Sequence, residues 1–302
     1  MPGKNNDFVS KIPDGCGIGC TGDFGSDGAE GVKQRLDAIL VERGFVTGRD
    51  RAKAAIAAGL VYIGGQKAEK AGAQYPFEVE IDFRGEDMKY VSRGGYKLER
   101  AVSVFEITLA HKICMDIGAS TGGFTDCMLQ NGAKQVYAVD VGVGQLNQRL
   151  LSDPRVVNME QTNIRYLEPD AIGTQLDFIS VDVSFISLQF VLPVTARLLG
   201  SMGEVVCLVK PQFEAGRERV GKGGVVRGKG THRDVLRNVL GYAKENGFLI
   251  AGLEYSPIKG PKGNIEYLLY LKPNINKKEC MTEAETAIAG VVEQAHRVLN
   301  QE

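Results

Sequence analysis

The chain has 302 residues, of which 43% are hydrophobic and 24% are charged, and its formal net charge at pH 7 is -1. This composition is typical of a globular protein with a hydrophobic core. The balanced charge excludes a protein that is drawn to nucleic acid by a strongly basic overall field, so any basic surface has to be local. The sequence has no apolar run long enough to span a bilayer and no apolar segment of the signal-peptide type at its N-terminus, and we therefore expect a cytoplasmic protein.

The first 31 residues differ in composition from the rest of the chain. They are rich in glycine and show no hydrophobic periodicity, so we expect 1–31 to be a disordered leader that the fold does not require. The six cysteines and three histidines of the chain do not show the paired spacing of a zinc site, and we expect no metal ion.

Residues 32–83 have the pattern of a small α+β domain. Leu36, Ile39 and Leu40 share one helical face, and Gly44 ends that helix. The apolar run 60–63 and the glycine pair after it predict a strand and a tight turn, and the alternating apolar residues of 76–83 predict one further strand. Between these elements a second helix, capped near Thr47, has an apolar face made of Ala52, Ala55, Ile56 and Ala57.

Basic residues are concentrated in this small domain. Residues 33–75 include eight basic and four acidic side chains, although the whole chain has a net charge of -1. Several of the basic residues lie around the start of the second helix, where backbone N–H groups also favour phosphate. One interpretation is a basic helix face that only contacts water. The other is an RNA-binding surface, for which the candidate residues are Arg35, Arg49, Arg51, Lys53 and Lys67.

A larger domain follows a junction at 84–95 and extends over 96–273, beginning with an amphipathic helix near Tyr96. Predicted strands alternate with helical segments, which is typical of a mostly parallel sheet with helices on both faces. The last two strands are joined by a short Pro/Gly loop and should therefore pair antiparallel. From 274 to 302 we expect a polar helical tail. The predicted strands are 113–117, 135–139, 178–181, 205–209, 248–255 and 265–271.

A glycine-rich turn follows the first of these strands, in the sequence from Cys114 to Phe124. Glycines allow a ligand to approach the backbone, and the start of the next helix offers free N–H groups. The spacing G-x-x-x-G-G is not the dinucleotide fingerprint, and the Gly-Lys-Ser/Thr of a phosphate-binding loop is absent from this turn. Gly216, Gly221 and Lys222 have the spacing of such a loop, but Gly223 stands where its Ser or Thr would be.

The remaining interpretation of this turn is a site for S-adenosylmethionine (SAM). Asp116 ends the first strand, where it suits the amino group of the methionine part, and Asp140 ends the next, where it suits the ribose hydroxyls. Alternatively, both are ordinary carboxylates at strand ends. We favour SAM, for which the candidate binding residues are Asp116, Gly118, Ser120, Gly122, Gly123, Phe124, Asp140, Asn163 and Asp182.

Four charged residues stand at positions where side chains meet in the ligand crevice of an open α/β sheet. Lys97 lies in the helix before the first strand, Asp182 and Lys210 end two strands, and Glu266 lies at the start of the last one. Any one of them alone is more often a solvated charge. As a set they are candidate catalytic residues.

With these motifs in place, the chain resembles the hemolysin A (TlyA) family over about residues 33–272. The resemblance is carried by Ser92-Arg93-Gly94-Gly95-Tyr96-Lys97-Leu98, by the turn after Asp116, and by the segments 181–187 and 209–214. It implies an S4-like RNA-binding domain followed by an FtsJ-like, Rossmann-like methyltransferase domain with a mostly parallel seven-stranded sheet and one antiparallel strand. Residues 35–37 and 59–65 are similar to the beginning and end of the S4 core.

The same resemblance implies an enzyme that uses SAM to methylate the ribose 2′-hydroxyl of cytidines in small- and large-subunit ribosomal RNA. Lys97, Asp182, Lys210 and Glu266 match the Lys-Asp-Lys-Glu tetrad of FtsJ-like enzymes in order, and Arg93 joins the candidate RNA-binding residues. Lys210 is the candidate to steer or accept the hydroxyl proton. Two alternatives remain: a non-enzymatic RNA-binding or ribosome-assembly protein, and a membrane-active hemolysin. The sequence leaves the oligomeric state open.

Overall fold

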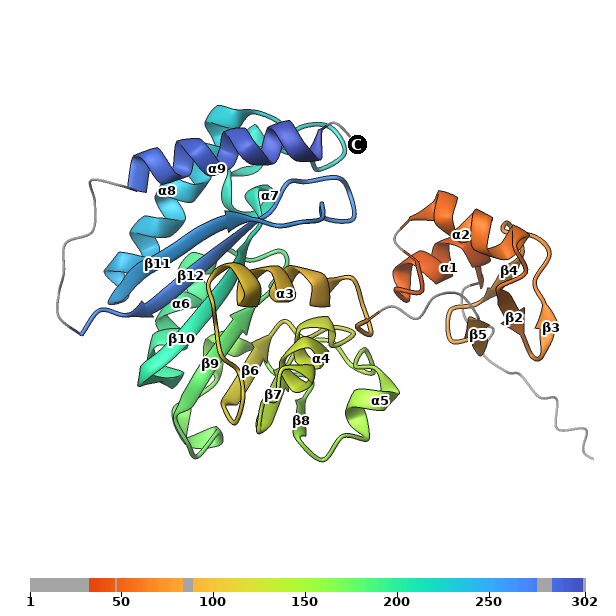
Figure 1. Ribbon diagram of the computed structural model, residues 1–302, viewed down its shortest axis with the longest axis horizontal. Helices are drawn as coiled ribbons and strands as arrows, with labels where there is room; N and C mark the ends of the chain where they lie inside the picture. The colour runs from red at the N-terminus through yellow and green to blue at the C-terminus, as the bar shows by residue number, and fades with distance from the viewer. Residues whose placement is uncertain (1–32, 47, 84–88, 276–283, 301–302) are drawn as a thin grey trace, which may run out of the picture.

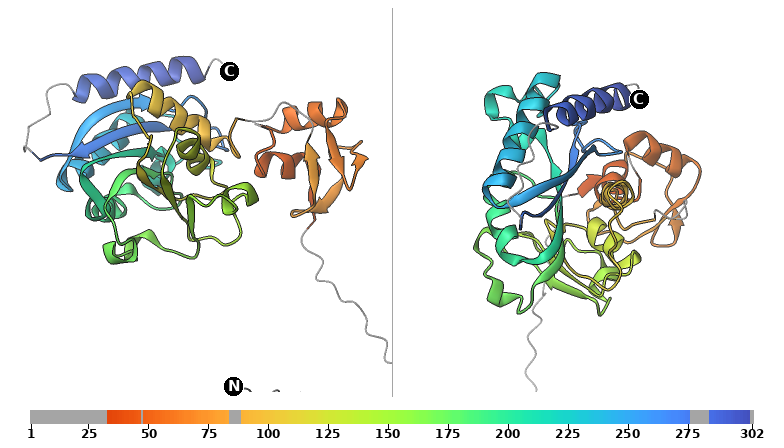
Figure 2. Two further views of the ribbon diagram at one scale, coloured as in Figure 1. Left: turned by 60° about the horizontal axis from the view of Figure 1, so that its bottom comes forward. Right: turned by 60° about the vertical axis from the view of Figure 1, so that its left-hand side comes forward.

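The structure is a computed structural model that describes residues 33–46, 48–83, 89–275 and 284–300. The leader predicted over 1–31 lies outside the described residues. Figure 1 shows a small N-terminal domain beside a larger α/β domain that begins at residue 89. Figure 2 shows the same two domains from two further directions.

The N-terminal domain is built around two short helices that pack on each other. Leu36 and Leu40 on one helix and Ala52 and Ile56 on the other are buried in one cluster with Val61, as the predicted helical faces require. Two small antiparallel sheets, β1–β4 and β3–β2–β5, complete the domain. Its elements are β1 (Lys33–Arg35), α1 (Leu36–Glu42), α2 (Arg49–Ala57), β2 (Val61–Ile63), β3 (Gln66–Lys67), β4 (Gln74–Pro76) and β5 (Ile81–Phe83).

The single strand predicted over 76–83 is wrong, because the chain turns within it. The N–H of Val79 donates to the carbonyl oxygen of Pro76 at 3.0 Å, which closes a turn between β4 and β5. β4 then pairs with β1, and β5 pairs with β2 in the other sheet. Alternation of apolar residues continues through the turn, so periodicity alone did not reveal the break.

The larger domain contains a seven-stranded sheet in the order β11–β12–β10–β9–β6–β7–β8. β12 is antiparallel to both of its neighbours, and the pairs from β10 to β8 are parallel, so the predicted fold class is confirmed. The short edge strand β8 was not among the segments predicted from periodicity. The strands are β6 (Ile113–Ile117), β7 (Gln135–Val139), β8 (Val156–Met159), β9 (Leu176–Val181), β10 (Leu199–Val209), β11 (Phe248–Tyr255) and β12 (Tyr267–Pro273).

Helices cover both faces of this sheet, because alternate strand residues point to opposite sides. In β6, Cys114 packs in a cluster with Leu98 of α3 and Met128 of α4, whereas Met115 packs in the cluster of the opposite face, to which α6, α8 and α9 contribute. Figure 1 shows α3 and α4 together on one side. The helices are α3 (Gly94–Val104), α4 (Gly123–Gln130), α5 (Gln148–Leu151), α6 (Leu192–Leu198), α7 (Pro211–Glu214), α8 (Lys229–Glu245) and α9 (Ala284–Leu299).

The C-terminal helix is part of the core, and the expectation of a polar tail helix is wrong. Ile288, Val292, Ala295 and Leu299 are buried, and α9 packs on α8 and β11, as Figure 1 shows along the upper edge of the domain. Val292, Ala295 and Leu299 lie four, seven and eleven residues after Ile288, which is the spacing of one helical face.

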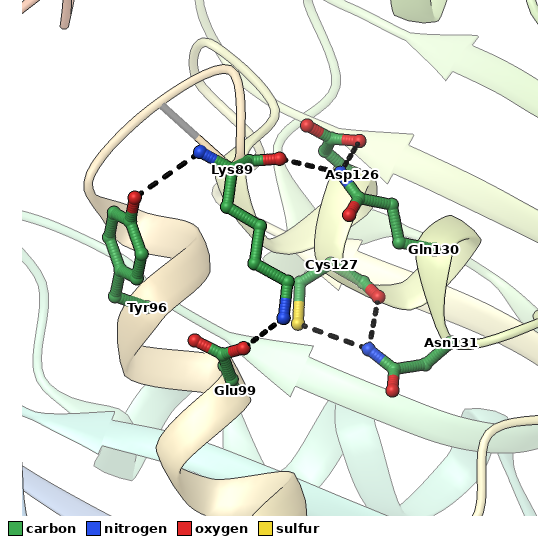
Figure 3. Close-up of polar contacts among 7 residues, drawn as sticks. All are labelled: Lys89, Tyr96, Glu99, Asp126, Cys127, Gln130 and Asn131. Atoms are coloured by element: carbon green, nitrogen blue, oxygen red, sulfur yellow. Dashed lines mark hydrogen bonds and ion pairs between the residues drawn. The ribbon is translucent and has the colours of Figure 1, made fainter. Parts of the chain in front are cut away.

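The junction between the domains is attached to the larger one from residue 89 onward. The backbone N–H of Lys89 donates to the Tyr96 hydroxyl at 3.2 Å, and its carbonyl oxygen accepts from Gln130 at 2.8 Å. Its ammonium group is paired with Glu99. Figure 3 shows these contacts, in which Lys89 bridges α3 and α4. The residue two positions later, Val91, donates its N–H to the Asp126 carboxylate at 2.8 Å.

Candidate active site

A cavity of about 1120 Å³ lies at the carboxyl ends of the parallel strands, which is where open α/β sheets bind their ligands. One part of its wall is the glycine-rich turn from Gly118 to Phe124, and another part is formed by residues that follow β9 and β10. The third part comes from the N-terminal domain, through Ala38, Val41 and Arg49 among others. The cavity is therefore shared by both domains.

The four candidate catalytic residues meet on the wall of this cavity. Lys97 Nζ lies 2.5 Å from Glu266 Oε2, and Lys210 Nζ lies 2.6 Å from Asp182 Oδ1. Lys97 is in the first turns of α3, Asp182 and Lys210 follow β9 and β10, and Glu266 directly precedes β12. Residues up to 169 positions apart in sequence are thus brought together as two ion pairs.

Burial and charge act against each other in this group. Burial by itself would raise the pKa of the Asp182 carboxyl, but the positive charges of Lys210 and Lys97 hold that pKa below its usual value. Burial would likewise lower the pKa of the Lys97 ammonium, and the charges of Glu266 and Asp182 instead raise it. The two pairs therefore act on each other as one charged cluster.

Lys210 has a further partner that the sequence did not indicate. Its Nζ donates to the Ser184 hydroxyl at 3.0 Å, and it lies 6.0 Å from the centre of the Phe213 ring. Glu214, which follows Phe213 in the sequence, accepts a hydrogen bond from the Ser187 hydroxyl at 2.7 Å and another from the Leu188 N–H at 2.8 Å. These contacts fasten the segment after β10 to the segment after β9.

An exposed aromatic side chain lies near the Lys210–Asp182 pair, through contact with Phe213. Phe185 is 91% exposed and has a φ of 64°, which is unusual for a residue other than glycine. Its ring lies 5.0 Å from that of Phe213, at an interplanar angle of 50°. Strained backbone that displays an apolar ring to solvent is found at functional sites, and both rings line the cavity.

Asp116 lies at the base of the glycine-rich turn and is only 1% exposed. Its carboxylate accepts from the N–H and hydroxyl of Thr125, at 2.9 and 2.7 Å, and from the Ser180 hydroxyl at 3.0 Å. Burial raises the pKa of this carboxyl to about 7, and the hydrogen bonds from Thr125 and Ser180 oppose that increase. Asp116 is also among the residues that line the cavity, and a cationic group bound next to its carboxyl would favour the charged form.

The turn itself has little room for side chains. Gly118 has a φ of +86°, and a Cβ atom there would lie 2.5 Å from the carbonyl oxygen of Asp182. Gly122 also has a positive φ, of +93°, and precedes α4 without a side chain that could cap that helix. The turn therefore presents backbone to the cavity, as a ligand that approaches the main chain requires.

Not all of the candidate cofactor-binding residues lie on the cavity wall. Asp140 stabilises the turn, because its carboxylate accepts hydrogen bonds from the N–H groups of Ser120 and Gly142, each at 2.8 Å. Gly122 faces the side chains of Leu146 and Leu150, and Asn163 accepts from the Arg165 N–H at 3.2 Å. The residues that do line the cavity are Asp116, Gly118, Ser120, Gly123, Phe124 and Asp182.

The candidate RNA-binding residues also divide into those that line the cavity and those that do not. Arg49 and Arg93 line the cavity, and Arg93 donates to the carbonyl oxygen of Lys259 at 3.0 Å. Arg35 forms a two-point ion pair with the buried Asp37, at 3.0 and 2.9 Å. Arg51, Lys53 and Lys67 occupy exposed positions on the N-terminal domain and are not among the residues that line the cavity.

None of the helices in the described ranges is both long and apolar enough to cross a membrane.

Comparison with known proteins assigns each of the two domains to a family. A family model described as FtsJ-like methyltransferase matches residues 90–273, and one described as S4 domain matches residues 34–81. A Mycobacterium tuberculosis protein named 16S/23S rRNA (cytidine-2′-O)-methyltransferase TlyA is 40% identical over 270 residues, which is 89% of this chain and 98% of the relative. Hemolysin A of Brachyspira hyodysenteriae is 41% identical, over 78% of this chain and 98% of its own.

A solved structure agrees with these sequence matches. It is a protein from Streptococcus thermophilus that is named as a hemolysin, with 47% identity and a TM-score of 0.76, and the match covers 89% of this chain and 98% of that one. The methyltransferase model matches more than half of the chain, and these relatives cover most of it. The chain therefore belongs to the TlyA/hemolysin A family of FtsJ-like methyltransferases, in which an S4 domain precedes the catalytic domain.

Proposed function

We propose that this protein transfers the methyl group of SAM to the 2′-hydroxyl of cytidine in ribosomal RNA. The observation that carries the proposal is the pairing of Lys97 with Glu266 and of Lys210 with Asp182 on the wall of one cavity, beside a glycine-rich turn. The name of the M. tuberculosis relative supports cytidines of both ribosomal subunits as the substrates to test first. An rRNA substrate makes the cytoplasm the site of the reaction.

The residues around the turn fit SAM. Asp116 offers a buried carboxylate at the cavity wall for the amino group of the methionine part. The start of α4 lacks a side-chain cap, so its N–H groups suit the methionine carboxylate. Bound there, SAM supplies a methyl group activated by a positively charged sulfur. Asp140 supports the turn through the Ser120 N–H and, being partly exposed, is the candidate to accept hydrogen bonds from the ribose hydroxyls.

Lys210 is the residue that handles the proton of the ribose hydroxyl. It lines the cavity, and its Nζ lies 2.6 Å from Asp182 Oδ1 and donates to the Ser184 hydroxyl at 3.0 Å. From this position Lys210 steers the ribose hydroxyl or accepts its proton, as the new oxygen–carbon bond forms and the carbon–sulfur bond of SAM breaks. Asp182 stabilises the ammonium form of this side chain.

The remaining residues of the cavity align the nucleotide. Lys97 and Glu266 are almost fully buried, so they hold a fixed geometry next to the Lys210–Asp182 pair. The exposed Phe185 ring and its neighbour Phe213 offer an apolar surface on which an unstacked base can lie. Alignment of oxygen, methyl carbon and sulfur supplies much of the rate, since well-oriented reactants reach effective molarities of about 10⁵ M or more.

The decisive experiment is a methyl-transfer assay with labelled SAM and separate small and large ribosomal subunits. We expect label on ribose of the wild-type product, and no transfer by Lys210→Ala, although this variant still binds SAM. Retention of near-normal turnover by Lys210→Ala would contradict the role given to this residue. Failure of the wild-type protein to label either subunit would overturn the proposed function, and would leave RNA binding without catalysis as the alternative.

A further inference from the structure

Two loops of the catalytic domain carry a marked excess of basic side chains. Residues 216–230 include five basic residues and one acidic residue, and residues 258–263 include two basic residues and no acidic one. The whole chain, by comparison, has a net charge of -1. The two loops together therefore hold seven basic residues and one acidic residue, a local excess of positive charge.

Most of these charges have no carboxylate partner. Arg219 is paired with Asp234 at 3.1 Å and Lys229 with Glu293 at 2.5 Å. The other five form no ion pair with any carboxylate in the ranges that the structure describes. We name these five the loop basic surface: Arg217, Lys222, Arg227, Lys259 and Lys262.

The two loops are fixed to each other by one buried side chain. Asn264 is 2% exposed; its Oδ1 accepts from the Val226 N–H and its Nδ2 donates to the Gly224 carbonyl oxygen, each at 2.9 Å. Its own carbonyl oxygen accepts from the Gly260 N–H at 2.9 Å. Because Asn264 is only two residues before Glu266, the loop basic surface is held in place relative to the catalytic residues.

The loop basic surface borders the same cavity as the S4 domain. Lys259 and Lys262 lie on the cavity wall, and Gly48 and Arg49 of the S4 domain line another part of it. Figure 1 shows the loop between β11 and β12 projecting on the side of the sheet where the S4 domain lies. A polyanion that crosses the cavity would therefore meet positive charge from both domains.

We propose that the loop basic surface binds backbone phosphates of ribosomal RNA, in addition to the phosphates that the S4 domain contacts. Unpaired cations that are held together repel one another, and a row of phosphates relieves that repulsion and releases condensed counterions. The proposal rests on the proposed function for the identity of the RNA. It adds a second RNA-binding surface, which lies on the catalytic domain.

The test is the salt dependence of RNA binding by Lys222→Ala with Arg227→Ala. Neither residue lines the cavity. The control is Lys134→Ala with Arg197→Ala, two exposed residues that precede β7 and β10 at the other end of the parallel strands, of which Arg197 is paired with Glu168 at 3.3 Å. The affinity of each full-length protein for ribosomal subunits is measured over a range of salt concentrations, with SAM affinity and thermal unfolding measured in parallel.

We expect the Lys222/Arg227 variant to bind RNA about tenfold more weakly at physiological salt, and its log–log salt slope to fall by about two, one for each phosphate contact that is lost. SAM affinity and turnover at saturating RNA stay at the wild-type level, and the control variant behaves as wild type. A slope equal to that of wild type, or an equal loss in the control variant, overturns the proposal. The binding measurement needs no methyl transfer, so it tests this surface even if the transfer assay fails.

Discussion

Asp116 is the residue at which protonation and ligand binding are most closely linked. Its pKa is raised to about 7 because its carboxyl is buried, although Thr125 and Ser180 donate hydrogen bonds to it. A cation at the cavity wall would favour the charged form, so a proton has to leave before an amino group can pair with it. The protonated form predominates below about pH 7 and the charged form above it.

We predict that SAM affinity falls as the pH is lowered below about 7, by up to about tenfold per pH unit. Asp116→Asn should bind SAM more weakly and lose this pH dependence, since its amide does not titrate. Calorimetric titration of both proteins between pH 6 and pH 8 measures the effect. Equal affinity of the wild-type protein at both ends of that range would contradict direct pairing of Asp116 with the ligand.

The convergence of the four candidate catalytic residues could be predicted from the sequence, but the contacts that orient them could not. Lys97, Asp182, Lys210 and Glu266 stand at strand ends or at the start of a helix, and the fold class brings such positions to one edge of the sheet. The side-chain direction of Asp140 or Asn163 is set by local hydrogen bonds. A strand-and-turn pattern does not contain this information.

At the scale of elements, the segments that follow β9 and β10 act as one unit. Glu214, at the end of α7, accepts hydrogen bonds from both Ser187 and Leu188. The strands that precede these segments are parallel neighbours. Asp182 and Lys210 are therefore held at their separation by the sheet on one side and by Glu214 on the other.

We predict that Glu214→Ala lowers kcat by up to about 100-fold, because small displacements of catalytic groups have effects of that size. Glu214→Gln should recover most of the activity, since its amide can accept from the Leu188 N–H and donate to the Ser187 hydroxyl. Single-turnover methyl transfer measures both variants, and SAM affinity should be unchanged in each. Normal kcat in Glu214→Ala would rule out this positioning role.

Element boundaries followed from the sequence where the local pattern was strong. The bounds of β6, β7 and β11 agree with the predicted ranges to the residue, because each is an apolar run between polar turns. β8 has only four residues at a sheet edge, which is too short for a clear pattern. The apolar residues of α9 do stand at helical spacing in the sequence. The segment 274–302 as a whole is rich in polar residues, and its composition alone therefore indicated a polar helix.

At the scale of the whole molecule, stability depends on a buried histidine that joins three elements. His232 of α8 is fully buried, with Nε2 3.0 Å from the Val226 carbonyl oxygen and Nδ1 2.7 Å from the Tyr267 hydroxyl. His296 of α9 lies 3.2 Å from the same Nδ1. Since a carbonyl oxygen only accepts, Nε2 carries the hydrogen and the neutral ring accepts at Nδ1.

Burial lowers the pKa of His232 to about 4, against a hydrogen bond to Val226 that raises it. The unfolded chain, with an ordinary pKa near 6.5, binds this proton first as the pH falls. The contribution of the neutral His232 ring to the free energy of unfolding is therefore complete above about pH 6.5. It decreases toward pH 4, by on the order of 3 kcal/mol. Urea unfolding at several pH values should show a smaller decrease in His232→Gln. An identical pH dependence in both proteins would exclude His232 as the group responsible.

The S4 domain and the catalytic domain make one RNA-binding protein through the cavity that they share. We predict that Arg49→Glu with Arg51→Glu weakens RNA binding and reduces its salt dependence, because phosphate contacts are lost. SAM affinity should not change, since the donor site is built from the catalytic domain. Filter binding in parallel with SAM titration checks both statements, and a loss of SAM affinity would show that the domains are not independent in this respect.

The close approach of Gly118 to Asp182 has a consequence for how the site responds to its ligands. The Asp182 N–H donates to the Ile117 carbonyl oxygen at 2.9 Å, and the space next to Gly118 does not admit even a methyl group. A shift of the glycine-rich turn would therefore press on the backbone of Asp182, which carries the carboxylate that is paired with Lys210.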